Sequence, residues 1–414
     1  MPETIFGNRI SQARTLRQRR LTELAELLDC SVPTMSKMER LRTVDVSSQQ
    51  LALLVQTLRF SADFFTSRPS PPLSDHDLLF KAPKSTLKRE ISWLREFMRL
   101  TSELLDWLDE RRRLPPVKVR LRSHESADIA DAARDLRENL GLAATTPIDY
   151  LTHPVERAGI VVIVRRRGLA DSEWISQSEQ SHTEYHEGCS TWVGEFRERP
   201  LVVMRGVNTW EKTRWVLAHE LGHLSLHAGR TLVSDEAEEH ASRFASELLA
   251  PICEIVKELP RVVTLAGLID VKSKWGISLA ALIKHLHSND VINDYRKKTL
   301  YDQLYTRRNP ETGRSFGVTE PGWDAHAPER PRLIAAWLKH ITGSLIPEAI
   351  ATASGIFPAD LLASILNEQR AAPSRSVSSA NSNRGRNSGG VIHLSERYPG
   401  RTSDPKHSLL NYLS

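Results

Sequence analysis

The sequence predicts a mostly α, multi-domain protein, with an all-α unit at the N-terminus, an α+β domain in the middle and further helices towards the C-terminus. The 414 residues are enough for two or three domains. Apolar residues recur at helical spacing along most of the chain, whereas the runs 160–164 and 201–204 are rich in β-branched residues and predict strands. Pro/Ser-rich and low-complexity stretches separate these parts. We therefore expect segments at residues 1–68, 69–118, 119–300, 301–370 and 371–414.

The first 68 residues predict a compact unit of short helices. Apolar positions mark a first helix over residues 5–16, a second over 24–28, a third around Met35 and Met38, and a fourth over 51–58. Ser31 is a suitable N-cap for the third helix, and Pro33 is tolerated there because it falls in the first turn. Two short helices joined by a tight turn and followed by more helix have helix-turn-helix geometry.

This segment resembles the Cro/CI (XRE) repressor domain in the motifs Ala13–Arg17, Leu24–Leu28 and Ser31–Arg40. It departs from that pattern at Leu21, where the family has Gln, and at Asp29, where the family has Gly. The resemblance implies DNA binding through residues 1–66, with base edges and phosphates contacted by Thr34, Lys37, Arg19, Arg20 and Arg40. The alternative is a dimerisation or partner-docking module that does not touch DNA.

Residues 69–118 are expected to form a hinge and a linker helix. The stretch SRPSPPLSDHD is rich in proline and serine, which predicts a hinge up to about residue 83. An amphipathic helix follows over about 85–113 and ends in Arg111–Arg113, where cations suit the helix dipole. This helix could serve as a spacer or as a dimer helix, so a homodimer is one of the expected assemblies.

The most informative stretch is His219-Glu220-Leu221-Gly222-His223, in a segment apolar enough to be a buried helix. Two histidines four residues apart project from the same face of a helix and can share one tetrahedral Zn²⁺. Glu220 lies between them and can take a proton from water activated at the metal, which is the chemistry of peptide hydrolysis. Zinc is the default, although the spacing does not distinguish it from Mn²⁺ or Fe²⁺.

A third ligand is expected from the helix predicted over residues 235–249. The acidic candidates there are Glu236, Glu238, Glu239 and Glu247, and Glu238 is our choice. Ser242 stands one turn after it and could orient a ligand histidine through a hydrogen bond. His227 continues the histidine stripe and could support the ligands in the same way, or it could be a packed core histidine.

These two helical segments resemble the ImmA/IrrE metallopeptidases. Residues Arg214–His227 follow the family pattern almost without departure, and Glu238–Pro251 follow its second motif, with His240 in place of Glu and Ser242 in place of Asn. The resemblance covers about residues 120–300. It implies a gluzincin-like domain in which a few strands back a helix pair that holds zinc, and a protein substrate that is often a repressor.

The rest of the chain is less specific. Residues 128–141 predict an amphipathic helix, two more surround Trp275–Ser278, and residues 331–369 add further helix. In the polar stretch 182–188, Tyr185 or His186 could stabilise a developing oxyanion, although a plain surface loop is the simpler interpretation. The low-complexity residues after 371 predict a largely disordered tail.

Composition predicts a cytoplasmic protein without a membrane segment. About 40% of the residues are hydrophobic and 26% are charged, with a net charge of +5. The three cysteines form no C-x-x-C pair, and the chain shows neither a signal core nor an apolar run long enough to span a membrane. We expect a zinc-dependent metallo-endopeptidase fused to a DNA-binding unit that cleaves a regulatory protein. The alternatives are a DNA-binding transcriptional regulator whose metallopeptidase-like domain only senses a ligand or metal, and a protein that ends repression by cleaving itself.

Overall fold

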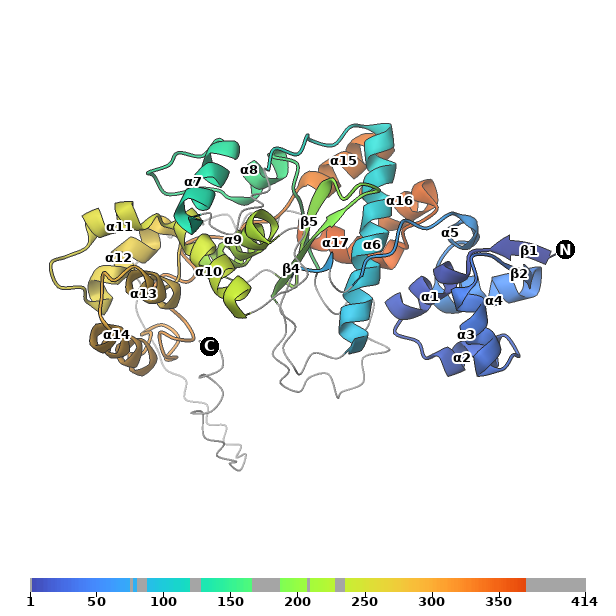
Figure 1. Ribbon diagram of the computed structural model, residues 1–414, viewed down its shortest axis with the longest axis horizontal. Coiled ribbons are helices and arrows are strands. Elements are labelled where there is room, and N and C mark those ends of the chain that lie inside the picture. The colour runs from blue at the N-terminus through green and yellow to red at the C-terminus, as the bar shows by residue number, and fades with distance from the viewer. Residues whose placement is uncertain are drawn as a thin grey trace, which may run out of the picture. The chain divides into compact units, whose positions relative to one another are not determined.

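The computed structural model describes residues 2–74, 77–79, 88–119, 128–165, 187–206, 209–227 and 235–369. Within these ranges the chain is mostly helical and has two small sheets, as the predicted fold class requires (Figure 1). The chain divides into a compact unit, Met1–Ala371, and the remaining residues, Ala372–Ser414. The tail predicted from residue 371 onwards, and Tyr185 and His186, lie outside the described residues.

The N-terminal segment contains the short helices that the sequence predicts, in the order α1 (Gly7–Leu16), α2 (Leu21–Leu27), α3 (Val32–Arg40), α4 (Ser48–Leu58) and α5 (Ala62–Thr66). The Ser31 side chain caps α3 by accepting a hydrogen bond from the backbone N–H of Thr34, and Pro33 lies in the first turn of that helix. Asp29 adopts a left-handed conformation with φ +50°, as the turn between α2 and α3 requires.

The prediction that this segment is wholly helical is wrong. Strand β1 (Pro2–Ile5) pairs antiparallel with β2 (Val44–Ser47), so Ile5 lies in a strand and not in the first helix. Ile5 and Val46 are both buried, because the strand pair covers one side of the helical core. The first helix begins at Gly7, where a Cβ would come within 2.1 Å of the carbonyl oxygen of Met38.

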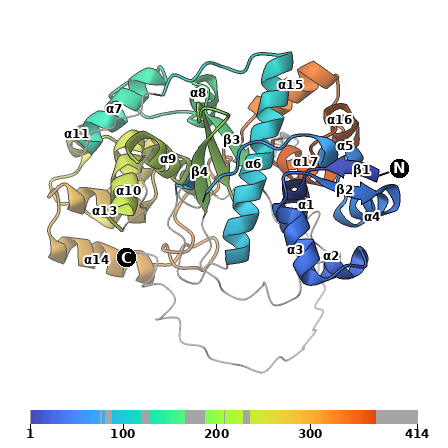
Figure 2. The same cartoon turned by 45° about the vertical axis from the view of Figure 1, so that its right-hand side comes forward.

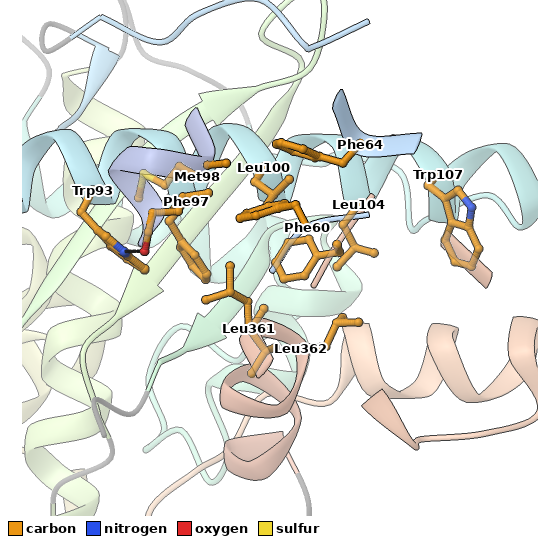
Figure 3. Packing of buried hydrophobic residues seen from close by; sticks show 14 of the residues in the cluster. Phe60, Phe64, Trp93, Phe97, Met98, Leu100, Leu104, Trp107, Leu361 and Leu362 are labelled. Carbon is orange, nitrogen blue, oxygen red and sulfur yellow. Dashed lines mark hydrogen bonds between the residues drawn. The ribbon is translucent and has the colours of Figure 1, made fainter. Parts of the chain in front are cut away.

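Helix α6 (Lys88–Arg111), which the sequence suggested as a linker helix, contributes many of the buried residues of one apolar cluster. Figure 3 shows its side chains packed with aromatic residues from the region of α5 and with leucines of α17 (Ala359–Gln369) in one apolar cluster. The indole N–H of Trp93 donates to the carbonyl oxygen of Leu16 at the end of α1 (3.0 Å). Helix α6 is amphipathic, as predicted, but its apolar face is covered by the segments on either side of it in the sequence.

A three-stranded sheet lies beside α6, in the strand order β3-β5-β4. The predicted strands are present as β3 (Val161–Val164) and β5 (Arg199–Met204), which run parallel to each other. Strand β4 (Gly188–Val193) pairs antiparallel with β5, with Ser190 opposite Val202, and the sequence did not predict it. Helices α7 (Ile129–Asn139) and α8 (Thr152–Arg157) precede the sheet in the sequence.

Helix α9 (Trp210–Leu226) packs against β4 and β5, and α10 (Asp235–Leu249) packs against α9 and α7, as both views show (Figures 1 and 2). The two helices approach closely at Gly222, where a Cβ would lie 3.0 Å from the Cα of Ala241. Gly222, which directly precedes the second motif histidine, therefore allows the backbones of the two helices to come close together. Among the described residues, none of the helices has the length and hydrophobicity that a membrane span requires.

The helices that follow are α11 (Ile252–Glu258), α12 (Leu265–Trp275), α13 (Leu279–Ser288), α14 (Asp294–Thr306), α15 (Leu333–Thr342), α16 (Pro347–Ser354) and α17. The pair predicted around Trp275–Ser278 is thus present as α12 and α13. The segment between α14 and α15 forms hydrogen bonds with residues from earlier parts of the sequence. Glu320 accepts from the N–H of Leu279 (2.9 Å), and Glu329 accepts from the N–H of Thr152 (2.7 Å).

Candidate metal centre

Helices α9 and α10 place three metal-binding side chains together. The Nε2 atoms of His219 and His223 are 3.2 Å apart, because residues four apart on α9 share a face. Glu238, in the first turn of α10, brings Oε2 to 3.2 Å from Nε2 of His219 and Oε1 to 3.3 Å from Nε2 of His223. In the part of the chain that the structure describes, His219, His223 and Glu238 are the residues whose donor atoms converge as a metal site requires, all within 4.8 Å of one another, and we call them the converging group.

The three side chains fit a zinc ion in both chemistry and spacing. Two imidazoles and one carboxylate are a common protein ligand set for catalytic zinc, which leaves one coordination position open. Donor atoms bonded to one tetrahedral zinc ion at about 2.0–2.1 Å lie about 3.3 Å from one another. The two histidine nitrogens are 3.2 Å apart, and each lies 3.2–3.3 Å from one of the two oxygens of the Glu238 carboxylate, which is close to that value.

The other acidic candidates on α10 lie elsewhere. The Glu236 side chain is 80% exposed, and Glu239 forms an ion pair with Lys284 at 2.7 Å. Glu247 is buried at the far end of the helix and accepts a hydrogen bond from the N–H of Ile252 (3.2 Å). Of the four carboxylates that the sequence suggested, only Glu238 belongs to the converging group among the described residues.

Burial and hydrogen bonding oppose each other at Glu238. Burial acts to raise the pKa of this carboxyl, but hydrogen bonds from His219 and His223 outweigh it and hold the pKa well below its usual range. The carboxylate is therefore anionic at neutral pH, which is the form that can bind a cation.

Glu220 faces the sheet and is 3% exposed. The hydroxyl of Ser190 on β4 donates to its Oε2 at 2.8 Å. Gly188 leaves room for the same side chain, because a Cβ there would lie 2.6 Å from Oε1 of Glu220. Burial raises the pKa of Glu220, as expected for a carboxyl that can take up a proton.

Sequence reasoning missed Gly188 and Ser190. Strand β4 reads GCSTWV and lacks the run of apolar residues by which β3 and β5 were predicted. A glycine and a serine in an edge strand have no recognisable spacing relative to a motif thirty residues further along the chain. Only the pairing of β4 with β5 and the packing of α9 on that sheet bring them to Glu220.

Further side chains contact the histidines of the converging group. The Nδ1 atoms of His223 and His227 are 3.1 Å apart, and Oγ of Ser242 lies 3.5 Å from Nδ1 of His219. The rings of Trp215 and His219 stack with centroids 5.1 Å apart. The structure thus places both Ser242 and His227 next to the distal nitrogen of a candidate ligand, where a hydrogen bond can fix the orientation of its ring.

The candidate DNA-contacting residues lie on α3 and directly before α2. Thr34, Lys37 and Arg40 are exposed on α3, and the Thr34 hydroxyl is 2.8 Å from that of Ser31. Arg19 and Arg20 flank the start of α2, and both form ion pairs with Glu23. The contacts of this segment with α6 and α17 come from other residues, such as Arg9 on α1, so they leave the outer face of α3 open.

Part of the chain matches a known protein family. Residues 155–287 match the Peptidase_M78 family model, described as the IrrE N-terminal-like domain. The match includes β3, β4, β5, α9 and α10, and therefore the whole converging group. It points to a metal-dependent peptidase, a hydrolase that acts on protein. The chain matches none of the curated proteins with which it was compared.

Proposed function

We propose that this protein is a zinc-dependent endopeptidase fused to a DNA-binding helix-turn-helix unit, and that it cleaves a repressor or another regulatory protein. The observation that supports this most directly is the buried carboxyl of Glu220, which interacts electrostatically with His219, His223 and Glu238, the three residues whose donor atoms converge. A site that only sensed a metal would need the donors but not an acid held next to them. The match of residues 155–287 to a peptidase family agrees with this proposal.

In the proposed reaction His219, His223 and Glu238 hold the cation. A bound divalent cation would supply a Lewis acid that makes water nucleophilic at neutral pH. The carboxylate of Glu220 takes a proton from water as the water oxygen bonds to the scissile carbonyl carbon, and it then passes that proton to the amine nitrogen as the bond from carbon to nitrogen breaks. Ser190 holds the carboxylate through its hydroxyl during both proton transfers.

The DNA-binding part of the proposal rests on α2, the turn at Asp29 and α3. Lys37 and Thr34 face solvent on α3, where they can reach base edges, while Arg20 and Arg40 are exposed and Arg19 is half-buried beside Glu23, and these three arginines would contact phosphates. Such a unit could place the peptidase at an operator or recruit the protein that it cleaves.

The variant Glu220→Gln tests the peptidase. We expect it to bind zinc as the wild type does, measured by elemental analysis, and to lose cleavage of an unfolded protein such as casein. Glu236→Gln, on the exposed face of α10, is the matched control and should cleave at the wild-type rate. If Glu220→Gln cleaves normally, the general-base role is wrong. If no zinc-loaded form of the chain, including the variant with Asp77→Ala and Leu79→Ala, cleaves casein or the proteins captured by the Glu220→Gln variant, the sensor alternative is favoured.

Lys37→Ala tests the DNA-binding unit. A pool of random DNA duplexes selected for binding to the wild-type chain supplies the probe, and we expect the variant to bind it at least tenfold more weakly. Lys257→Ala, an exposed lysine on α11, removes the same charge far from α3 and should bind normally. Failure of the wild type to select any sequence would favour the docking-module alternative.

A further inference from the structure

The outer edge of β4 is occupied by another part of the chain. The order β3-β5-β4 leaves β4 at the edge of the sheet, with the backbone groups of Ser190 pointing away from β5. Leu79 forms an antiparallel bridge with Ser190 on this outer side. The N–H of Leu79 donates to the carbonyl oxygen of Ser190 at 2.8 Å, and the N–H of Ser190 donates back at 3.5 Å.

Side chains on both sides of this bridge hold the segment Asp77–Leu79 in place. The hydroxyl of Thr191 donates to the carbonyl oxygen of Asp77 at 2.7 Å, and Arg197 forms an ion pair with the Asp77 carboxylate at 2.9 Å. Leu78 and Leu79 are both buried, but in different apolar clusters: Leu79 belongs to the cluster that includes residues of α9 and α10, and Leu78 to the cluster that includes residues of α6. Consecutive side chains that enter opposite sides of a sheet are typical of a β-strand, so the segment resembles a strand added to the edge of the sheet.

This edge adjoins the candidate metal centre. Ser190 pairs with Leu79 through its backbone and holds Glu220 through its side chain. Gly188, two residues earlier on the same strand, lies against the Glu220 carboxylate. An extended chain that pairs with the outer edge of β4 therefore runs alongside the acid that the proposed reaction requires.

The unpaired backbone groups of an edge strand are a template for an extended peptide, which adds to the sheet as one more strand. At Ser190 these groups already bond to Leu79, so a second chain cannot pair there at the same time. The ion pair between Asp77 and Arg197 is partly exposed, with 28% and 37% of the side chains accessible. Exposed pairs of this kind contribute little to stability.

We propose that Asp77–Leu79 is an autoinhibitory strand that occupies the substrate edge of β4. The substrate is an extended protein segment with a large apolar residue that takes the place of Leu79, and the segment must leave before that substrate can bind. This inference rests on the proposed peptidase function, whose site the segment would control.

The test uses the full chain with the double variant Asp77→Ala/Leu79→Ala, which removes the ion pair with Arg197 and the buried leucine side chain. Leu268→Ala, which removes the same side-chain atoms from a buried leucine of α12 in a separate apolar cluster, is the matched control. The probe is a fluorescent peptide with the sequence of the chain's own residues 74–82, SDHDLLFKA. Binding is followed by fluorescence anisotropy on the metal-free proteins, so this measurement does not depend on catalysis.

We expect the double variant to bind the peptide at least tenfold more tightly than the wild type or Leu268→Ala. A peptide with aspartate in place of the leucine at position 79 should not bind. Hydrogen exchange at the amide of Ser190 should be faster in the double variant and slow again when the peptide is added. Equal binding to wild type and double variant, or binding that ignores the leucine, would overturn the proposal.

Cleavage separates this proposal from the peptidase proposal. With zinc added, the double variant should cleave casein several-fold faster than the wild type, and a further Glu220→Gln change should abolish cleavage. If the double variant binds the peptide but no form of the protein cleaves casein, the peptidase proposal fails, whereas the proposal that Asp77–Leu79 occupies the edge of β4 is retained. If cleavage depends on Glu220 but is no faster in the double variant, the autoinhibitory role fails while the peptidase proposal stands.

Discussion

The hydroxyl of Ser190 lies 2.8 Å from Oε2 of Glu220 and joins the edge strand β4 to the middle of the motif helix α9. The carboxyl is buried, and within the described chain this side-chain hydrogen bond fixes which way its oxygens face. A proton acceptor is useful only if it points at the proton, so the position of Glu220 depends on a residue thirty positions away.

Ser190→Ala should lower kcat about tenfold without changing KM or zinc content, because the carboxylate loses its orientation but not its place beside the donors. A tenfold loss corresponds to about 1.4 kcal/mol of transition-state stabilisation. Ser190→Thr keeps the hydroxyl and should recover most of the rate. Steady-state kinetics on casein measures both variants, and an unchanged kcat in Ser190→Ala would show that the hydrogen bond has no positioning role.

Gly222→Val should destabilise the protein and weaken zinc binding together. Its side chain would meet the backbone of α10 at Ala241 and the ring of Phe244, so α9 and α10 must move apart. Overpacking of this kind costs about 1–3 kcal/mol. Urea unfolding and a competitive zinc titration measure the two effects. Gly141→Val, at a position with open space around it, strains a left-handed backbone without touching the helix pair, and it should leave zinc affinity unchanged.

Arg9→Met should lower the free energy of unfolding by about 3–5 kcal/mol. The Arg9 guanidinium is buried and pairs with Glu103 at 2.7 Å, which connects α1 to the central helix α6. Removing the cation leaves a carboxylate buried without its partner. The double variant Arg9→Met/Glu103→Leu should be more stable than Arg9→Met alone, since it removes the second charge as well. Chemical unfolding measures the free energy of unfolding of both variants, and a double variant less stable than Arg9→Met would contradict the prediction.

Glu320→Gln should make the stability of the protein less sensitive to pH between about 4.5 and 7. Burial raises the pKa of Glu320 to about 7, against the opposing effects of the Leu279 N–H and of Lys272. In this interval the folded state binds more protons than the unfolded state, so the free energy of unfolding falls as pH rises, by up to about 1.4 kcal/mol per pH unit for this group.

Urea unfolding at several pH values measures that slope. Glu156 has a pKa raised to about 7, chiefly by burial, so part of the slope should remain in Glu320→Gln. Glu348→Gln, at an exposed position on α16, is the control and should keep the wild-type slope. A slope in Glu320→Gln equal to that of the control would contradict the prediction.

Local patterns determined much of this protein from sequence alone. The spacing of His219, Glu220 and His223, the cap at Ser31 and the apolar periodicity of α6 depend on neighbours within one or two helical turns, so they can be read without knowing the fold. The choice of Glu238 among four carboxylates needed only the period of one helix, and the structure places it beside both histidines.

Only the tertiary structure decided which segments far apart in the sequence contact one another. The burial of α6, the pairing of β1 with β2, the bond from Ser190 to Glu220 and the bridge from Leu79 to Ser190 each join segments that are far apart in sequence. A strand such as β4 takes its role from the neighbours it pairs with, and its own residues do not specify them. The sequence alone thus predicted the side chains that converge and the acid between the two histidines, whereas long-range packing decided which way that acid faces and which segment lies along the edge beside it.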